Sequence, residues 1–73
     1  MLEKILAIVA DELGSPLDKV TPDLKFSQSG IDSLEFVVLV QAMEDAFWKI
    51  PDARWAHIDS PQDIERELEA AKP

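Results

Sequence analysis

The sequence predicts an all-α fold: a small four-helix bundle of three main helices and one short helix, with a long loop between the first two helices. Three observations support this prediction. Apolar residues recur at three- and four-residue intervals in three segments, each of these segments begins or ends at residues that favour helix termini, and no segment carries a convincing strand pattern. Residues 1–73 are expected to form a single domain, near the lower size limit for one hydrophobic core.

The first helix is expected to run from residue 2 to the glycine at position 14. Its apolar residues share one face and its charged residues lie largely on the other, as in an amphipathic helix. The apolar positions are Leu2, Ile5, Leu6, Val9 and Leu13. Gly14 is placed to end the helix, and the following Ser15-Pro16 supports the break.

Residues 15–31 are predicted to form a long connection. Pro16, Pro22 and the polar cluster at residues 27–30 prevent a continuous helix, although a short helical turn is expected at residues 16–20. A loop of this length in so small a domain is unusual unless it is functional or packs through its own side chains. Four apolar residues are therefore expected to anchor it on the core: Leu17, Val20, Leu24 and Phe26.

The second helix is expected to begin at Asp32 or Ser33. Asp32 is suited to the N-cap, and Glu35, three residues later, is placed to complete a capping box. The helix is expected to end at residue 47 or 48, because the residue that precedes Pro51 avoids the helical region.

The helical period divides this second helix into two faces. The core face is expected to hold Phe36, Leu39, Val40, Met43, Ala46 and Phe47. The opposite face, called the outer arc, is expected to hold Leu34, Val37, Val38, Gln41, Glu44, Asp45 and Trp48, with Ser33 at its edge. A solvated helix face normally carries charge at most positions, whereas this one combines an apolar patch with acids. Either other segments cover Leu34, Val37 and Val38, or the patch docks a partner protein.

Two further helical segments are predicted towards residue 73. Residues 51–56 are expected to form the short helix, with Pro51 at its first position. The final helix has clearer start signals, with Ser60 as the N-cap, Pro61 at the first position and Asp63 at the third. Its apolar face is expected to hold Ile64, Leu68 and Ala71.

The charge of the chain disfavours several classes of partner. Fifteen acidic residues against seven basic residues give a net charge of −8, which nucleic acid and anionic membranes would repel. No apolar run is long enough to insert into a membrane, and Glu3 and Lys4 interrupt the first apolar stretch, so a cytoplasmic protein is expected. A monomer is also expected. The acids either guide docking onto basic patches of other proteins or simply keep the domain soluble.

Catalysis and metal binding are not expected. A nucleophile at Ser33 would need His57, a third group and a substrate cleft, and a small helical bundle has little volume for such a cleft. His57 is expected at a loop or at the edge of the core. The chain has no cysteine, one histidine and no calcium-loop spacing, which disfavours a metal site.

Ser33 is suited to a covalent phosphate ester. The first amides of a helix have free N–H groups, and the positive end of the helix dipole favours an anion. A serine near a helix start is usually a cap, but Asp32 already occupies the capping position and leaves the Ser33 hydroxyl spare.

The stretch from Gly30 to Leu34 resembles the Asp-Ser-Leu attachment motif of the acyl carrier protein family, in which the serine carries 4′-phosphopantetheine. The resemblance continues through the second helix and the turn that ends it, at Glu35, Glu44, Asp45, Phe47, Ile50, Pro51 and Asp52. The first helix, the long loop and the start of the last helix also fit the family's four-helix layout, so the resemblance covers nearly the whole chain.

This resemblance implies a carrier function. The chain would hold acyl intermediates as thioesters on a 4′-phosphopantetheine arm attached to Ser33, and would shuttle them between enzymes of fatty acid, polyketide or related biosynthesis. The arm would come from coenzyme A through a phosphopantetheinyl transferase, in a magnesium-dependent reaction of that partner.

The resemblance also implies a recognition surface on the second helix. Recognition by the transferase would involve Asp32, Leu34 and Glu35. The basic docking patches of acyl-loading, elongating or acyl-transferring enzymes would meet Val37, Val38, Glu44 and Asp45. Rapid, weak and salt-sensitive binding suits a shuttle that must dissociate.

The chain departs from the family pattern after the serine. Val38 lies where fatty acid carriers usually have an acid, and Trp48 and Lys49 occupy a turn that is often acidic or contains glycine. Together with Trp55, these residues favour a specialised carrier of a polyketide, modified lipid or aminoacyl pathway over ordinary drift within the family. Two alternatives stay open: a peptidyl or aminoacyl carrier of nonribosomal synthesis, and an unmodified helical adaptor.

Overall fold

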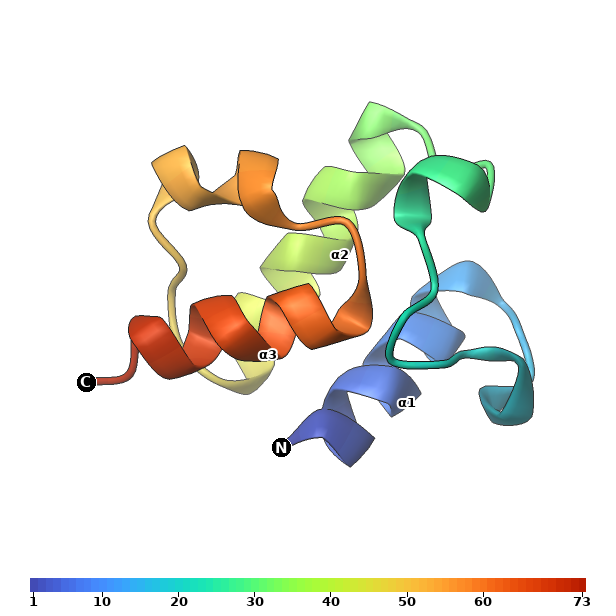
Figure 1. The fold of residues 1–73 in the computed structure, drawn as a ribbon, viewed down its shortest axis with the longest axis horizontal. Helices are drawn as coiled ribbons and strands as arrows, with labels where there is room; N and C mark the ends of the chain where they lie inside the picture. The colour runs from blue at the N-terminus through green and yellow to red at the C-terminus, as the bar shows by residue number, and fades with distance from the viewer.

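Three α-helices and one six-residue 3₁₀ helix form the fold (Figure 1). In the computed structural model, which describes residues 1–73, α1 spans Leu2–Leu13, α2 spans Ser33–Ala46 and α3 spans Pro61–Ala70, while η3 spans Asp52–His57. Two single turns of 3₁₀ helix, η1 (Leu17–Lys19) and η2 (Phe26–Gln28), interrupt the long loop between α1 and α2. The predicted four-helix all-α fold is confirmed. No helix combines the length and the apolar character needed to cross a membrane.

Local sequence signals account for the helix termini. Gly14 ends α1 with a φ of 64°, in the left-handed region that glycine adopts without a Cβ penalty. At the start of α2, the Asp32 carboxylate accepts the Glu35 amide at 2.8 Å, and the Glu35 carboxylate accepts the Asp32 amide at 3.5 Å. The Ser60 hydroxyl likewise accepts an amide hydrogen bond at the start of α3. The predicted glycine stop, capping box and serine cap are all confirmed.

The hydrophobic core lies between α1, α2 and α3, and side chains from the loops complete it. Its buried residues are Ile5, Val9, Ala10, Val20, Phe26, Leu39, Met43, Ile50, Ile58, Ile64 and Leu68. Burying one large aliphatic side chain contributes about 1.5 to 3 kcal/mol, so this cluster supplies most of the drive to fold. The predicted core face of α2 is confirmed, with Leu39, Val40 and Met43 buried and the other members partly buried.

One predicted detail of the fold is wrong, and another is confirmed to within one residue. Helix α2 ends at Ala46, with Phe47 as its C-cap, next to the predicted end at about residue 47 or 48. The chain leaves the helix there and places the Trp48 indole on α3, where its N–H donates to the Leu68 carbonyl at 2.8 Å. Leu17 does not anchor the loop, because its side chain is 57% exposed. Val20 leaves the η1 turn in an extended conformation and is buried, so the two side chains have different surroundings.

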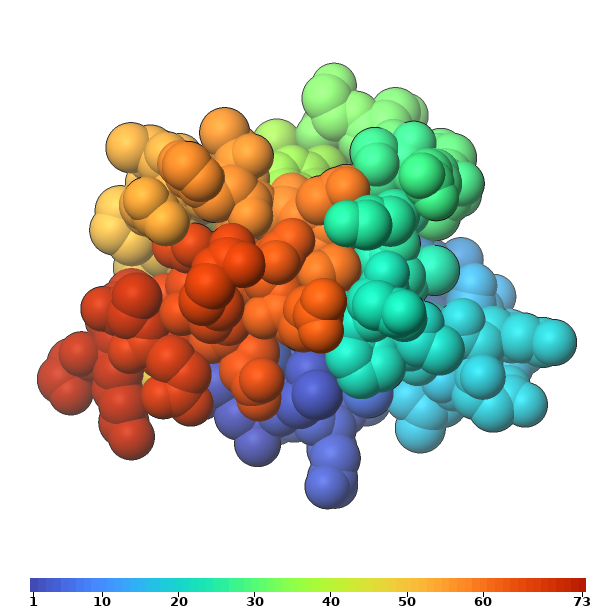
Figure 2. Space-filling model, in the orientation of Figure 1, coloured from blue at the N-terminus to red at the C-terminus, as the bar shows by residue number.

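The remaining predicted anchors hold the loop against the start of α3. Phe26 is buried and Leu24 is partly buried. The Phe26 amide donates to the Asp59 carbonyl at 2.7 Å, and the Gln62 amide donates to the Pro22 carbonyl at 3.0 Å. Figure 2 shows the loop and the start of α3 lying side by side. These contacts fix the path of the chain into α2.

Candidate functional site

Ser33 is the first residue of α2, and its side chain is exposed. Gly30 turns the chain into the helix with a φ of 82°, a conformation that L-residues rarely adopt. Asp32 follows in an extended conformation as the N-cap, and its carboxylate, not the Ser33 hydroxyl, accepts the first-turn amide. The Ser33 hydroxyl is therefore presented at the helix start without serving as its cap.

The start of α2 combines attraction and repulsion for an anion. The first amides of an α-helix have no partner within the helix, and the Asp32 carboxylate takes the amide of Glu35, which leaves the amides of Ser33 and Leu34 for a ligand. The helix dipole adds partial positive charge at the same end. The neighbouring carboxylates of Asp32 and Glu35 repel an anion at this end of the helix. A phosphate held covalently at Ser33 does not depend on a favourable binding energy and can still use the free amides.

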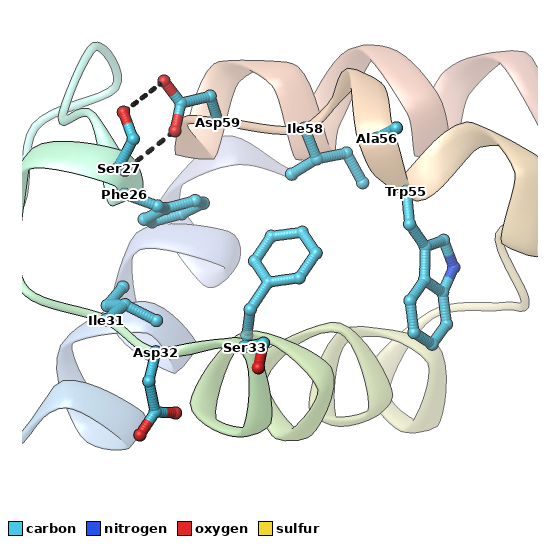
Figure 3. Close-up of a pocket in the computed structure, with 10 residues that line it drawn as sticks. Phe26, Ser27, Ile31, Asp32, Ser33, Trp55, Ala56, Ile58 and Asp59 are labelled. Atoms are coloured by element: carbon cyan, nitrogen blue, oxygen red, sulfur yellow. Dashed lines mark hydrogen bonds between the residues drawn. The ribbon is translucent and has the colours of Figure 1, made fainter.

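An open pocket of about 280 Å³ lies beside Ser33, between the start of α2, η2 and η3 (Figure 3). Its apolar wall is formed by Phe26, Ile31, Phe36, Trp55, Ala56 and Ile58. Its polar residues are Ser27, Asp32, Ser33 and Asp59. The rings of Phe26 and Phe36 meet edge to face, with centroids 6.4 Å apart. The attachment candidate thus lies at the rim of a mostly apolar hollow.

Hydrogen bonds hold two walls of this pocket in place. The Asp59 carboxylate accepts the amide of Ser27 at 2.9 Å and its hydroxyl at 3.0 Å, which joins η2 to the segment before α3 (Figure 3). On the opposite wall, the indole N–H of Trp55 donates to the Ile50 carbonyl at 3.2 Å. One wall therefore depends on a contact between residues far apart in the sequence, and the other on a contact within a single turn of the chain.

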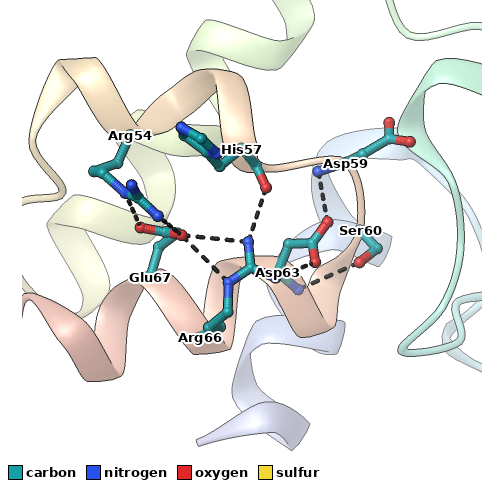
Figure 4. Close-up of polar contacts among 7 residues, drawn as sticks. All are labelled: Arg54, His57, Asp59, Ser60, Asp63, Arg66 and Glu67. Carbon is teal, nitrogen blue, oxygen red and sulfur yellow. Dashed lines mark hydrogen bonds and ion pairs between the residues drawn. The ribbon is translucent and has the colours of Figure 1, made fainter.

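A buried acid ties η3 to α3 (Figure 4). Glu67, whose side chain is only 2% exposed, accepts hydrogen bonds from Arg54 at 2.8 and 3.0 Å. Arg66 reaches the same carboxylate and also donates to the His57 carbonyl at 2.9 Å. The Arg54 hydrogen bonds, helped by Arg66, lower the pKa of Glu67 despite its burial, and Glu67 raises the pKa of Arg54. The charged pair thus stabilises the position of η3 and of the Trp55 wall.

Asp63 supports the same segment from the first turn of α3. Burial alone would raise the pKa of its carboxyl group, but contacts with the Asp59 amide, Ser60 and Arg66 outweigh burial and lower the pKa. The Asp63 carboxylate accepts the Asp59 amide at 2.9 Å and an Arg66 hydrogen bond at 2.8 Å. Asp63 was predicted only as a start signal of the final helix, and Glu67 was not predicted as a structural acid. One sequence signal could have indicated that Glu67 is buried: it lies on the apolar face of α3, between Ile64 and Leu68.

The predicted recognition residues fall in different surroundings. Leu34 is 71% exposed and Val38 is 44% exposed, so other segments do not cover them, while Val37 is half-buried. Asp45 is exposed, whereas Glu44 is half-buried and its carboxylate accepts the Ile50 amide at 2.8 Å. Leu34, Glu35 and Val38 share a shallow hollow with Glu12 and Leu13 of α1, a proximity that the sequence did not predict.

His57 does not line the pocket beside Ser33. It is exposed at the end of η3, as the sequence predicted for a residue at a loop or core edge, and its backbone carbonyl accepts Arg66. No three acidic, histidine or cysteine side chains are grouped so as to hold a metal ion.

Comparisons with known proteins agree with this geometry. The model of a protein family described as the phosphopantetheine attachment site matches residues 3–68. An acyl carrier protein of Akkermansia muciniphila is 42% identical over 64 residues, which cover 85% of this chain and 80% of that protein. An acyl carrier protein of Thermosynechococcus vestitus is 39% identical over 66 residues, which cover 88% of this chain and 82% of that protein. The match to the family model includes α2 and its N-cap as well as the pocket residues.

Proposed function

Because this chain belongs to the acyl carrier protein family, whose members bear a covalently attached phosphopantetheine group, we propose that Ser33 is the residue that carries it. The observation that supports this assignment best is the exposed hydroxyl of Ser33 at the first position of α2, directly after a residue that already caps the helix. Residues 1–73 would then act as a single carrier domain.

The residues around Ser33 fit a phosphopantetheine arm. The free amides at the start of α2 suit its phosphodiester, and the adjacent pocket offers an apolar wall to the rest of the arm. The bound arm supplies a terminal thiol on which acyl groups are held as thioesters. The chain itself contributes the attachment hydroxyl, the amides that face the phosphate and the wall formed by Trp55 and Ile58. Catalysis would belong to the partner enzymes.

A carrier of this family works with a phosphopantetheinyl transferase and with enzymes that handle the acyl group. We infer that these partners approach the start and the outer arc of α2 through basic patches. The proposed recognition residues are Asp32, Leu34, Glu35, Val37, Val38, Glu44 and Asp45. Two facts support this surface: the exposed apolar side chains of Leu34 and Val38, and the net charge of −8 on the chain.

We also infer that the protein acts in the cytoplasm as a monomer and serves a specialised pathway. The net charge of −8 disfavours self-association through acidic faces. The apolar Val38 and the Trp55 ring beside the pocket support a specialised set of partners, whereas Trp48 packs on α3. The names of the two relatives support acyl cargo over aminoacyl cargo.

The experiment that tests the assignment is incubation of the purified chain with coenzyme A, magnesium and a broad-specificity phosphopantetheinyl transferase, followed by intact-mass measurement. The expected result is a gain of one phosphopantetheine group that Ser33→Ala abolishes. Ser29→Ala is the matched control, because Ser29 is also exposed and lies just before α2, and this variant should still gain the group.

Two results would contradict the assignment. A chain that gains no mass would be an unmodified helical adaptor. A Ser33→Ala variant that still gains the group would carry it on another residue. Partial proteolysis of the loaded chain then locates the modified peptide directly.

A further inference from the structure

Two side chains separate the pocket beside Ser33 from the hydrophobic core. Phe26 and Ile58 line this pocket, and both also belong to the buried core cluster, as no other pocket residue does. Figure 3 shows them reaching the pocket from different elements, Phe26 from η2 and Ile58 from the end of η3. A group in the pocket would therefore have to displace one of these two side chains to reach the core.

The core behind Phe26 and Ile58 is closely packed. Leu39, Met43 and Leu68 are fully buried, and they line none of the hollows on the surface of the molecule. Protein interiors resist added volume, because extra atoms force side chains away from their preferred rotamers. An alkyl chain could enter this core only if residues at its edge moved aside.

A set of hydrogen bonds, here called the Asp59 clip, holds Phe26 at the edge of the core. The Asp59 carbonyl accepts the Phe26 amide at 2.7 Å, and the Asp59 carboxylate accepts both the amide and the hydroxyl of Ser27. The clip is anchored on α3, because the Asp63 carboxylate accepts the Asp59 amide at 2.9 Å. Three hydrogen bonds from one residue to two successive residues leave the η2 turn little freedom to move Phe26 aside.

The Phe26 ring is also supported from α2. It meets the Phe36 ring edge to face, with an angle of 61° between the ring planes, in a geometry that stabilises aromatic pairs. Phe26 is thus fixed through its backbone by Asp59 and through its ring by Phe36.

We propose that the Asp59 clip keeps acyl groups out of the core, so that this carrier holds short acyl groups in the surface pocket beside Ser33. The inference rests on the proposed function and names the class of cargo: an acyl group short enough to lie against Phe36 and Trp55 without displacing Phe26. A long alkyl chain would exceed this open pocket and leave apolar surface in water, which is unfavourable. Asp59 is a positioning residue in this role, because its carboxylate contacts Ser27 and not the acyl group.

The test attaches alkyl groups directly at position 33, because the chain has no cysteine of its own. Ser33→Cys provides a single thiol, which butyl or dodecyl iodoacetamide alkylates, as intact mass verifies. Both groups should shift the same amide signals in nitrogen-15 NMR, those of pocket residues such as Phe36 and Trp55. The signals of Met43 and Leu68 in the core should be the same with either group.

Release of the clip should admit the longer group. Asp59→Ala removes both carboxylate bonds to Ser27, and in this variant the dodecyl group alone should shift the Met43 and Leu68 signals. It should also raise the midpoint of thermal unfolding by about 4 to 8 °C over the butyl form, because a buried alkyl chain adds apolar contacts. Ser27→Ala is a milder variant at an exposed position, loses only the hydroxyl bond, and should show the same effect at a smaller size.

Two matched variants separate the clip from the loss of a charge. Asp59→Asn should behave like the chain with Asp59, since its amide oxygen can accept the Ser27 amide and its NH₂ group can donate to the Ser27 hydroxyl. Asp18→Ala removes an exposed acid from η1 and should also leave the dodecyl group outside the core.

Either of two results would overturn the proposal. The first is a shift of the core signals by the dodecyl group while Asp59 and Ser27 are unchanged. The second is the absence of such shifts in both Asp59→Ala and Ser27→Ala. Failure of the proposed function is recognised separately, because alkylation of the thiol does not use the transferase, whereas loading of Ser33 with phosphopantetheine is read by intact mass.

Discussion

The Glu44 carboxylate accepts a hydrogen bond from the backbone amide of Ile50, with 2.8 Å between Oε2 and the nitrogen. The two residues lie on either side of the turn that leaves α2, and Ile50 is fully buried in the core. An acid that the sequence suggested only for partner recognition therefore also closes the end of the helix and helps to hold Ile50 in the core.

Glu44→Ala is expected to lower the free energy of unfolding by about 1 kcal/mol, because the buried Ile50 amide loses its acceptor. Glu44→Gln should cost much less, since its side-chain oxygen can still accept the amide. Urea unfolding followed by circular dichroism measures both. Equal losses for the two variants would mean that the charge of Glu44, not the hydrogen bond, stabilises the turn.

Gly30→Ala and Gly14→Ala should each destabilise the fold by about 1 kcal/mol, because both glycines have positive φ values. An added Cβ would meet no atom within 4 Å at either position, so the cost comes from the backbone conformation alone. Only Gly30→Ala should also slow phosphopantetheine transfer, because it alters the turn that presents Ser33. Transfer rates followed by intact mass separate the two effects. Equal slowing in both variants would assign the effect to general destabilisation.

Asp32→Ala is expected to cost about 1 kcal/mol of stability through loss of the capping box, while Asp32→Ser should retain most of it. Thermal unfolding with far-ultraviolet circular dichroism measures the loss. If Asp32→Ala unfolds at the temperature of the unchanged protein, the prediction is wrong: either the cap contributes nothing or the Ser33 hydroxyl has replaced it.

Glu67→Gln should lower the free energy of unfolding at neutral pH by about 1 to 2 kcal/mol. This loss is smaller than for a fully buried ion pair, because both arginine partners are half-exposed and solvent screens their charge. The folded-state pKa of Glu67 lies below its ordinary value of 4.5. Its stabilising contribution is therefore complete above pH 4.5 and is lost as the pH falls through the folded-state value.

Urea unfolding of both proteins from pH 7 down to about pH 3 tests this prediction, and the two stabilities should converge at the acid end. Glu69→Gln is the control, since Glu69 is exposed on the same helix and should show no such convergence. A constant difference between Glu67→Gln and the unchanged protein at every pH would contradict the assigned charge effect.

Local chemistry explains why much of the fold was predictable from the sequence. A glycine at position 14, an Asp32–Glu35 pair and a Ser60–Pro61 start each act over one helical turn, so their outcome depends little on the rest of the chain. The apolar period of α2 similarly identified Leu39 and Met43 as core residues. The placement of Ser33 at a helix start followed from the same local signals.

The features of the fold and the site that the sequence did not predict depend on contacts between distant residues. The Ser27–Asp59 hydrogen bonds and the Arg54–Glu67 pair join segments far apart in the sequence, and no local pattern specifies them. Leu17 was expected in the core because it is apolar, but the path of the loop decides its exposure. The proximity of Leu34 to α1 has the same origin, since it depends on how two helices pack.

The Trp55 indole, which forms one wall of the pocket beside Ser33, gives the protein an optical reporter of its own state. An arm or acyl group that enters the pocket changes the polarity around this indole and therefore shifts its fluorescence emission. The Trp48 indole is hydrogen-bonded to the Leu68 carbonyl and does not line the pocket, so its emission should not respond to loading and forms only a background. Loading and unloading of the carrier can thus be followed in real time without a label, using Trp48→Phe to isolate the signal of Trp55.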